Sequence, residues 1–185
     1  HRQCPQSSPR MILIYAATNR RSESHEAIRA HPRNPRKKFP RTPMTIALAE
    51  TDSDIARCFP VMVQLRPKLR ADEFVARIRH QHTEGYRLAF LGDDTGPVRS
   101  VAGFRLTNRL HAGRVLYVDD LVTDAASRSL GHGDRLFDWL VAHARALGCD
   151  AFTLDSGTQR VDAHRFYLRK RMKISAFHFD LPLAK

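Results

Sequence analysis

Arg128, Gly131 and Gly133 are spaced in a way that favours anion binding at the start of a helix. The first turn of a helix has backbone N–H groups with no partner inside the helix, and the helix dipole makes that end positive. Glycine has no Cβ, so an anionic group can approach the backbone closely, and Arg128 adds a cation. Residues 128–133 are therefore predicted to bind a diphosphate group. The alternative is that the glycines only let the chain turn into the helix.

A strand before this junction and a helix after it must position it. Residues 114–123 are rich in β-forming Val, Leu, Tyr and Thr, which predicts a strand. Residues 124–129 have the composition of a loop. From Gly131 to Gly148, apolar residues recur at spacings of three and four, which predicts a helix with one buried face. Gly148 ends that helix, because glycine adopts a left-handed backbone at low cost.

Two adjacent carboxylates, Asp119 and Asp120, lie late in this hydrophobic strand. Successive side chains of a strand point to opposite faces, so only one of the two can face a cleft unless a β-bulge intervenes. A carboxylate here can accept a proton directly or through water, bind a cationic acceptor, or pair with nearby arginines. Asp119, which shares its face with Leu121 and Thr123, is the first choice of base, and His178 is an alternative.

Three motifs resemble those of the GNAT (Gcn5-related) N-acetyltransferases. The hexapeptide Arg128-Ser129-Leu130-Gly131-His132-Gly133 resembles the family's Arg/Gln-x-x-Gly-x-Gly/Ala acetyl-CoA motif. Leu121-Val122-Thr123 is similar to the Leu-x-Val that ends the preceding strand. The segment from Asp162 to Tyr167 is similar to the Ala-x-x-(Leu/Phe)-Tyr of the last helix. The resemblance extends over about residues 44–183.

This resemblance implies a mixed α/β sheet of six to seven strands with about four helices, in which two parallel strands splay apart around acetyl-CoA. It implies that Tyr167 gives a proton to the departing thiolate, the alternative being a tyrosine of the core. A backbone N–H near Leu121 or Val122 is the implied oxyanion donor, and no metal is implied. The residues implied to bind acetyl-CoA are Leu121, Val122, Thr123, Arg128, Ser129, Leu130, Gly131, His132 and Gly133.

Two positions depart from the family pattern. Members often have Asn three residues before the alanine of the last helix, where this chain has Arg160. They also commonly end that helix with Gly-Phe, where this chain has Arg171-Met172. The first departure concerns one cofactor contact and the second a turn, and neither involves residues 128–133.

Periodicity and turn residues predict the remaining elements. The order of the strands around 86–123 favours antiparallel pairing, and the strand–helix–strand unit around residues 131–148 favours a parallel pair. Pro60 is expected to kink or end the first helix. The further strands are predicted at 45–49, 86–91, 98–106, 151–155 and 174–181, and the further helices at 55–65, 72–85 and 159–170.

Composition indicates one globular domain at residues 44–185. The chain has 185 residues, 42% of them hydrophobic, and no apolar run long enough to cross a bilayer. Its three cysteines, Cys4, Cys58 and Cys149, have no metal-ligand spacing and cannot all pair, which favours reduced thiols and a cytoplasmic location. No membrane partner is expected.

Residues 1–43 are predicted to be a disordered basic extension. They hold ten Lys or Arg against two Glu, which is +8 of the formal charge of +12. Because the chain does not begin with methionine, whereas Met44 begins the domain, we expect the extension to be a non-native gene-start artefact without a role. The alternative is a basic arm that binds nucleic acid or an acidic surface. The domain itself is only mildly basic, so a nucleic-acid partner is not favoured.

The sequence thus predicts an N-acetyltransferase that transfers the acetyl group of acetyl-CoA to a primary amine by direct attack in a ternary complex. The predicted acceptor is a small-molecule or peptide amine. The oligomeric state is left open between a monomer and a homodimer. A non-catalytic acyl-CoA-binding or regulatory module is the second hypothesis. A nucleic-acid-binding protein acting through the basic extension is the third.

Overall fold

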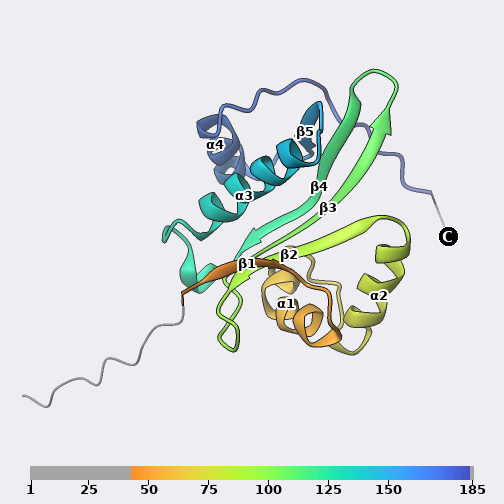
Figure 1. Ribbon diagram of the computed structural model, residues 1–185. Helices are drawn as coiled ribbons and strands as arrows, with labels where there is room; N and C mark the ends of the chain where they lie inside the picture. The colour runs from red at the N-terminus through yellow and green to blue at the C-terminus, as the bar shows by residue number, and fades with distance from the viewer. Residues whose placement is uncertain (1–42, 184–185) are drawn as a thin grey trace, which may run out of the picture. The chain divides into compact units, whose positions relative to one another are not determined.

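The computed structural model describes residues 43–183 (Figure 1). The predicted disorder of residues 1–43 therefore concerns a segment that lies, except for Pro43, outside the described residues. The described residues contain five strands, four α-helices and one short 3-10 helix. In chain order these are β1 (Thr45–Leu48), α1 (Asp52–Leu65), α2 (Ala71–Thr83), β2 (Tyr86–Gly92), β3 (Ser100–Arg109), β4 (Gly113–Thr123), η1 (Ala125–Ser127), α3 (His132–Ala146), β5 (Ala151–Leu154) and α4 (Val161–Arg169).

The five strands form one mixed sheet in the order β1-β2-β3-β4-β5. The first four strands pair antiparallel with their neighbours in sequence, and β5 pairs parallel with β4 through the α3 crossover. Both pairing modes were predicted from the order of the elements, and both are confirmed. The mixed α/β class and the four helices are confirmed as well.

Helices cover both faces of this sheet (Figure 1). On one face, buried residues of α1 and α2, such as Ile55 and Phe74, pack against Leu88 and Val101 of the sheet. On the other face, the apolar stripe of α3 packs against β3, β4 and β5. Helix α1 begins with a capping box, in which Thr51 and Asp54 satisfy each other's backbone N–H groups. It continues through Pro60 to Leu65, so the helix does not end at that proline.

The predicted last strand, residues 174–181, is also wrong, and the sheet has five strands rather than six or seven within the described residues. A strand needs a neighbour to receive its backbone hydrogen bonds, and no pairing of residues 173–183 with the sheet is present there. Phe177 and Phe179 are 85% and 90% exposed, so their alternation with polar residues does not mark a buried face. The segment contacts the end of β5 through an ion pair of 3.1 Å between His178 and Asp155.

Candidate active site

Strand β4 has an unpaired edge over its last five residues. Its parallel pairing with β5 stops at Val118, opposite Leu154, and beyond that point β4 pairs with β3 alone. The N–H of Asp124 donates to the carbonyl of Arg99 on the β3 side. Because strand residues alternate between the two edges, Leu121 and Thr123 turn their N–H and C=O groups to the open edge. The splay implied by the resemblance is present, and it exposes backbone groups in a row.

The chain then turns sharply into α3. Asp124 caps η1 by accepting from the backbone N–H of Ala126 at 3.4 Å. Ser129 has a φ of 62° and Gly131 a φ of 80°, both in the left-handed region, and Gly131 is the N-cap of α3. A non-glycine residue in this region is uncommon, so two left-handed residues within three positions mark a specially shaped loop. That loop directs the start of α3 toward the end of β4.

The loop and the first turn of α3 carry backbone N–H groups without partners. The first helical bond runs from Arg135 to Gly131 at 3.1 Å, and Gly131 offers no side chain as a cap. Within residues 43–183, no hydrogen bond is donated by the backbone N–H groups from Arg128 to Asp134. The first N–H groups of a helix have no partner inside the helix, so this row of donors is available to an anion.

The two glycines of the motif have different tasks. A Cβ on Gly131 would meet nothing within 4 Å, so glycine serves there for its backbone conformation and leaves the approach open. A Cβ on Gly133 would lie 2.9 Å from the hydroxyl oxygen of Thr123. Gly133 therefore allows the first turn of α3 to lie against the end of β4. The neighbouring His132 is buried, and burial lowers its pKa. The structure thus brings Thr123 and Gly133, one residue from each predicted group, close together.

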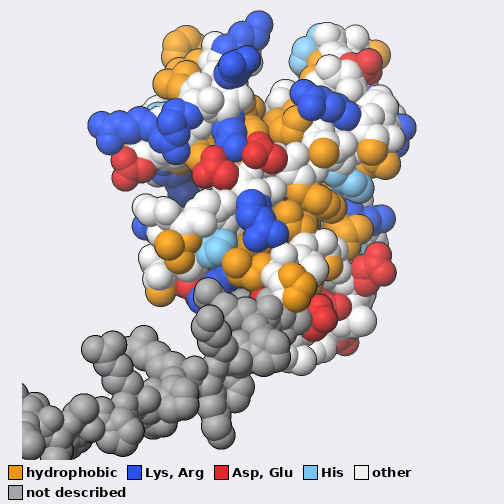
Figure 2. All heavy atoms as spheres, turned by 60° about the vertical axis from the view of Figure 1, so that its left-hand side comes forward, with side chains coloured by type: hydrophobic (Ala, Val, Ile, Leu, Met, Phe, Trp, Pro, Cys, Tyr) orange, Lys and Arg blue, Asp and Glu red, His pale blue; other side chains and the backbone are white. Residues whose placement is uncertain are grey.

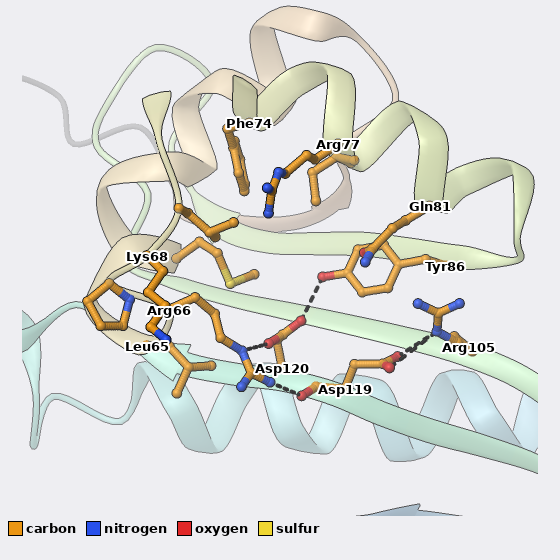
Figure 3. Close-up of a pocket in the computed structure, with 14 residues that line it drawn as sticks. Leu65, Arg66, Lys68, Phe74, Arg77, Gln81, Tyr86, Arg105, Asp119 and Asp120 are labelled. Atoms are coloured by element: carbon orange, nitrogen blue, oxygen red, sulfur yellow. Dashed lines mark hydrogen bonds and ion pairs between the residues drawn. The ribbon is translucent and has the colours of Figure 1, made fainter. Parts of the chain in front are cut away.

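A β-bulge places both predicted carboxylates in one cavity. Gly103 of β3 pairs with Asp120, and Phe104 pairs with Val118, so Asp119 is an extra residue in β4. In a regular strand only one of the two carboxylates would face a cleft. The bulge breaks the alternation of side chains, so this restriction does not apply here. Asp119 and Asp120 both line a cavity of about 510 Å³ between the sheet and helices α1 and α2 (Figure 3).

The two carboxylates have different environments. Asp120 accepts a hydrogen bond from the hydroxyl of Tyr86 at 3.0 Å and one from Nε of Arg66 at 2.7 Å, which engages both carboxylate oxygens. Asp119 accepts from Nε of Arg105 at 3.2 Å to each oxygen. Burial raises the pKa of Asp119, and the nearby guanidinium of Arg105 lowers it by less. Asp119 is therefore more basic than an ordinary aspartate, whereas Asp120 is held by two donors.

Tyr86 reaches Asp120 by crossing over a glycine. Its ring lies on β3 at Gly103, where any Cβ would overlap the tyrosine hydroxyl and ring. Burial and the neighbouring Asp120 raise the pKa of Tyr86 well above its usual value, so its hydroxyl stays protonated and donates. Tyr86, Arg66 and Arg105 were not predicted from the sequence as residues of the site. A glycine inside a strand often marks close approach by another group, and Gly103 was the available signal.

Replacing Gly103 with Ala should destabilise the protein by about 1–3 kcal/mol, because the added methyl group overlaps Tyr86. In an ordinary strand this substitution would be neutral or stabilising. Urea denaturation would measure the change. In a Tyr86→Leu background, where no ring covers the glycine, the same substitution should cost much less; an equal cost in both backgrounds would contradict the packing argument.

Tyr167 lies apart from the acidic pair. It is on α4, where the neighbouring Phe166 packs edge-on against Phe137 of α3 at 5.4 Å between ring centroids. It is not among the residues that line the cavity of Asp119 and Asp120. Its hydroxyl makes no hydrogen bond within the described part of the chain, and burial raises its pKa. His178, the alternative base, is exposed and pairs with Asp155 outside that cavity.

The described residues offer neither a metal-binding cluster nor a membrane-spanning helix. In residues 43–183, no three His, Cys, Asp or Glu side chains are grouped to hold a metal ion. None of the helices in the same range combines the length and apolar character that a membrane span requires.

Residues 48–172 match the profile of the acetyltransferase (GNAT) family. Over 130 residues the chain is 35% identical to the uncharacterized N-acetyltransferase YhdJ of Bacillus subtilis, which covers 69% of this chain and 91% of that protein. Over 113 residues it is 33% identical to the aminoalkylphosphonate N-acetyltransferase of Salmonella typhimurium, with 60% of this chain and 71% of that protein covered.

A solved structure has the same fold. Glucosamine-6-phosphate N-acetyltransferase from Arabidopsis thaliana superposes with a TM-score of 0.62 over 77% of this chain and 99% of that one, at 18% identity. The family profile spans well over half of the sequence, and it includes the open edge of β4 and the loop at the start of α3. The chain belongs to the GNAT acetyltransferase family.

Proposed function

We propose that this protein is an acetyl-CoA-dependent N-acetyltransferase that acts on the primary amine of a small molecule by direct attack in a ternary complex. Family membership supports acetyl transfer in general. Relatives named for aminoalkylphosphonate and glucosamine 6-phosphate act on small amines, and this chain has a cavity of the size that such molecules need. The protein is expected to work in the cytoplasm without a metal.

The unpaired backbone donors from Arg128 to Asp134 carry this proposal. They are assigned to the diphosphate of acetyl-CoA, with the exposed side chain of Arg128 as an added cation. The open edge formed by Leu121 and Thr123 is assigned to the pantetheine arm, which has amide groups that can pair with a strand. The outward N–H of Leu121 is the assigned donor to the oxyanion.

Asp119 is assigned as the group that takes a proton from the ammonium of the acceptor, so that the neutral amine can attack the thioester. Its carboxylate lines the cavity, shares a single donor, Nε of Arg105, between its two oxygens, and has a raised pKa. Asp120 is assigned to positioning, since Tyr86 and Arg66 occupy both of its oxygens. The sulfur of the departing thiolate receives its proton from Tyr167, whose hydroxyl has no other partner within residues 43–183.

Release of free thiol from acetyl-CoA in the presence of a panel of amines tests this function. Amine-dependent release is the expected result. Tight binding of CoA without release for any amine would instead support the non-catalytic regulatory module. Absence of a calorimetric signal with millimolar CoA would contradict both assignments.

Replacing Tyr167 with Phe should lower kcat about 10- to 100-fold, at the lower end of proton-transfer effects. The loss is moderate because a thiol of pKa about 8.5 leaves tolerably well as the thiolate. Calorimetry should give an unchanged Kd for CoA, since the hydroxyl is assigned only to the sulfur. Tyr117→Phe is the matched control, because that hydroxyl bonds to Asp155 instead. Equal effects of the two substitutions on kcat would argue against the assigned role.

A further inference from the structure

The cavity of Asp119 and Asp120 contains more positive than negative groups. Four cationic side chains line it, against two acidic ones, which leaves a net charge of +2. Figure 2 shows lysine and arginine side chains around acidic ones on one face of the protein. An amine acceptor arrives as an ammonium ion, and a positive cavity repels a molecule that carries only positive charge. The four lining cations are Arg66, Lys68, Arg77 and Arg105.

These cations fall into two groups by their partners. Arg66 pairs with Asp120 at 2.7 Å, and Arg105 pairs with Asp119 at 3.2 Å, so these two are neutralised by the carboxylates of the site. Lys68 has no carboxylate partner in the described part of the chain. Arg77 has only a 3.5 Å contact with Glu73, and both of those side chains are more than 40% exposed. Such surface pairs contribute little, so Lys68 and Arg77 remain available to a ligand.

The available cations lie where a second part of the acceptor would be. Lys68 is in the connection from α1 to α2, and Arg77 is on α2, whereas the two carboxylates are on β4. In Figure 3, Lys68 lies on the opposite side of the cavity from Arg105, and Arg77 points toward the cavity from α2. Apolar side chains such as Leu69 and Ile78 also line the cavity. The two carboxylates and the two available cations therefore come from different elements around one partly apolar cavity.

We propose that the acceptor is a small amine that also carries an anionic group, a phosphate, phosphonate or carboxylate, which Lys68 and Arg77 bind while the amine faces Asp119. This inference rests on the proposed acetyl transfer and adds the class of acceptor. Lysine and arginine are both phosphate and carboxylate ligands, and Arg77 can bind two oxygens at once. The same charges exclude polyamines and other acceptors with several cationic groups.

Steady-state kinetics with three acceptors of similar size tests the proposal: 2-aminoethylphosphonate, ethanolamine and 1,3-diaminopropane. The value of kcat/KM should be highest for the phosphonate and lowest for the diamine. Lys68→Gln and Arg77→Gln should each raise KM for the phosphonate about 10- to 100-fold, as expected for loss of a charge-assisted hydrogen bond. They should not lower kcat/KM for ethanolamine, because ethanolamine has no anionic group for these side chains to bind and the loss of a cation weakens the repulsion of its ammonium. Arg145→Gln removes an equal charge from the exposed side of α3 and should not change kcat/KM for either acceptor.

A kcat/KM for the diamine that equals or exceeds that for the phosphonate would overturn the proposal and leave acetyl transfer intact. Equal effects of the Gln variants on kcat/KM for all three acceptors would do the same. Calorimetry with 2-aminoethylphosphonate and the CoA-saturated protein provides a readout that needs no turnover. Binding that weakens in the Lys68 and Arg77 variants, without turnover of any amine, would support the anion site and contradict the proposed function. Absence of binding would overturn the anion site.

Discussion

Replacing Gly131 with Asp is expected to weaken CoA binding about 10- to 1000-fold. The new carboxylate would lie beside the unpaired N–H groups from Arg128 to Asp134, where the diphosphate is assigned. Two like charges about 4 Å apart repel by about 1–4 kcal/mol, depending on how far water screens them. Asp also tolerates the left-handed backbone of this position better than most residues, and nothing lies within 4 Å of the new Cβ. The fold should survive, and calorimetry would measure the loss of affinity.

Gly131→Asn is the matched control, because it has the same shape and backbone preference without the charge. The ratio of the Kd values for the two variants therefore isolates the electrostatic part of the effect. Raising the salt concentration should reduce that ratio, because salt screens exposed charges. Equal affinities of the Asp and Asn variants for CoA would show that no anion binds at this turn.

Replacing Asp119 with Asn is expected to lower kcat about 100- to 10,000-fold, as for loss of a general base. Asn has nearly the same shape, and binding of CoA at the start of α3 should not change. In the unsubstituted protein, kcat/KM should fall with decreasing pH as Asp119 becomes protonated. Because burial raises its pKa, this fall should occur at higher pH than for an ordinary aspartate. In the Asn variant, that part of the pH profile should be absent.

Asp94→Asn is the control, since Asp94 is exposed in the loop between β2 and β3 and does not line the cavity. It should leave kcat and its pH dependence unchanged. Asp120→Asn separates positioning from proton transfer, because it would weaken the contacts with Tyr86 and Arg66 but leave Asp119 ionisable. Retention of the acidic fall in the Asp119→Asn variant would exclude Asp119 as the base.

The region around α3 could be predicted because its structure requires particular residue types at positions that are close together in the sequence. A backbone anion site needs glycine at Gly131 and Gly133, and the amphipathic pattern after it defines the helix. The parallel pairing of β4 and β5 followed from the order strand–helix–strand. The position at which this pairing stops was implied only by the resemblance, since periodicity carries no information on where two strands diverge.

The cavity could not be derived in this way, because its contacts join distant segments. Arg66 and Asp120 are 54 positions apart, and Tyr86 and Asp120 are 34 apart. The bulge that turns Asp119 toward the cavity leaves no clear pattern in β4 itself. Residues 174–181 show the opposite failure, because alternation predicts a strand but no neighbour within residues 43–183 pairs with it. A local sequence pattern indicates that a segment can form a strand. Whether the strand forms depends on a neighbouring strand that pairs with it.

The divergence of β4 from β5 has a consequence for solubility. An exposed sheet border normally attracts strands of other molecules and promotes aggregation. Here the available backbone lies in the middle of the sheet order, and β5 already occupies Val115–Val118 on the same side. A foreign strand would have to fit into the five positions 119–123 between the end of β5 and the turn into η1, whereas a narrow flexible ligand needs no more space. The protein can thus keep main-chain groups ready for a ligand without offering them to its neighbours in solution.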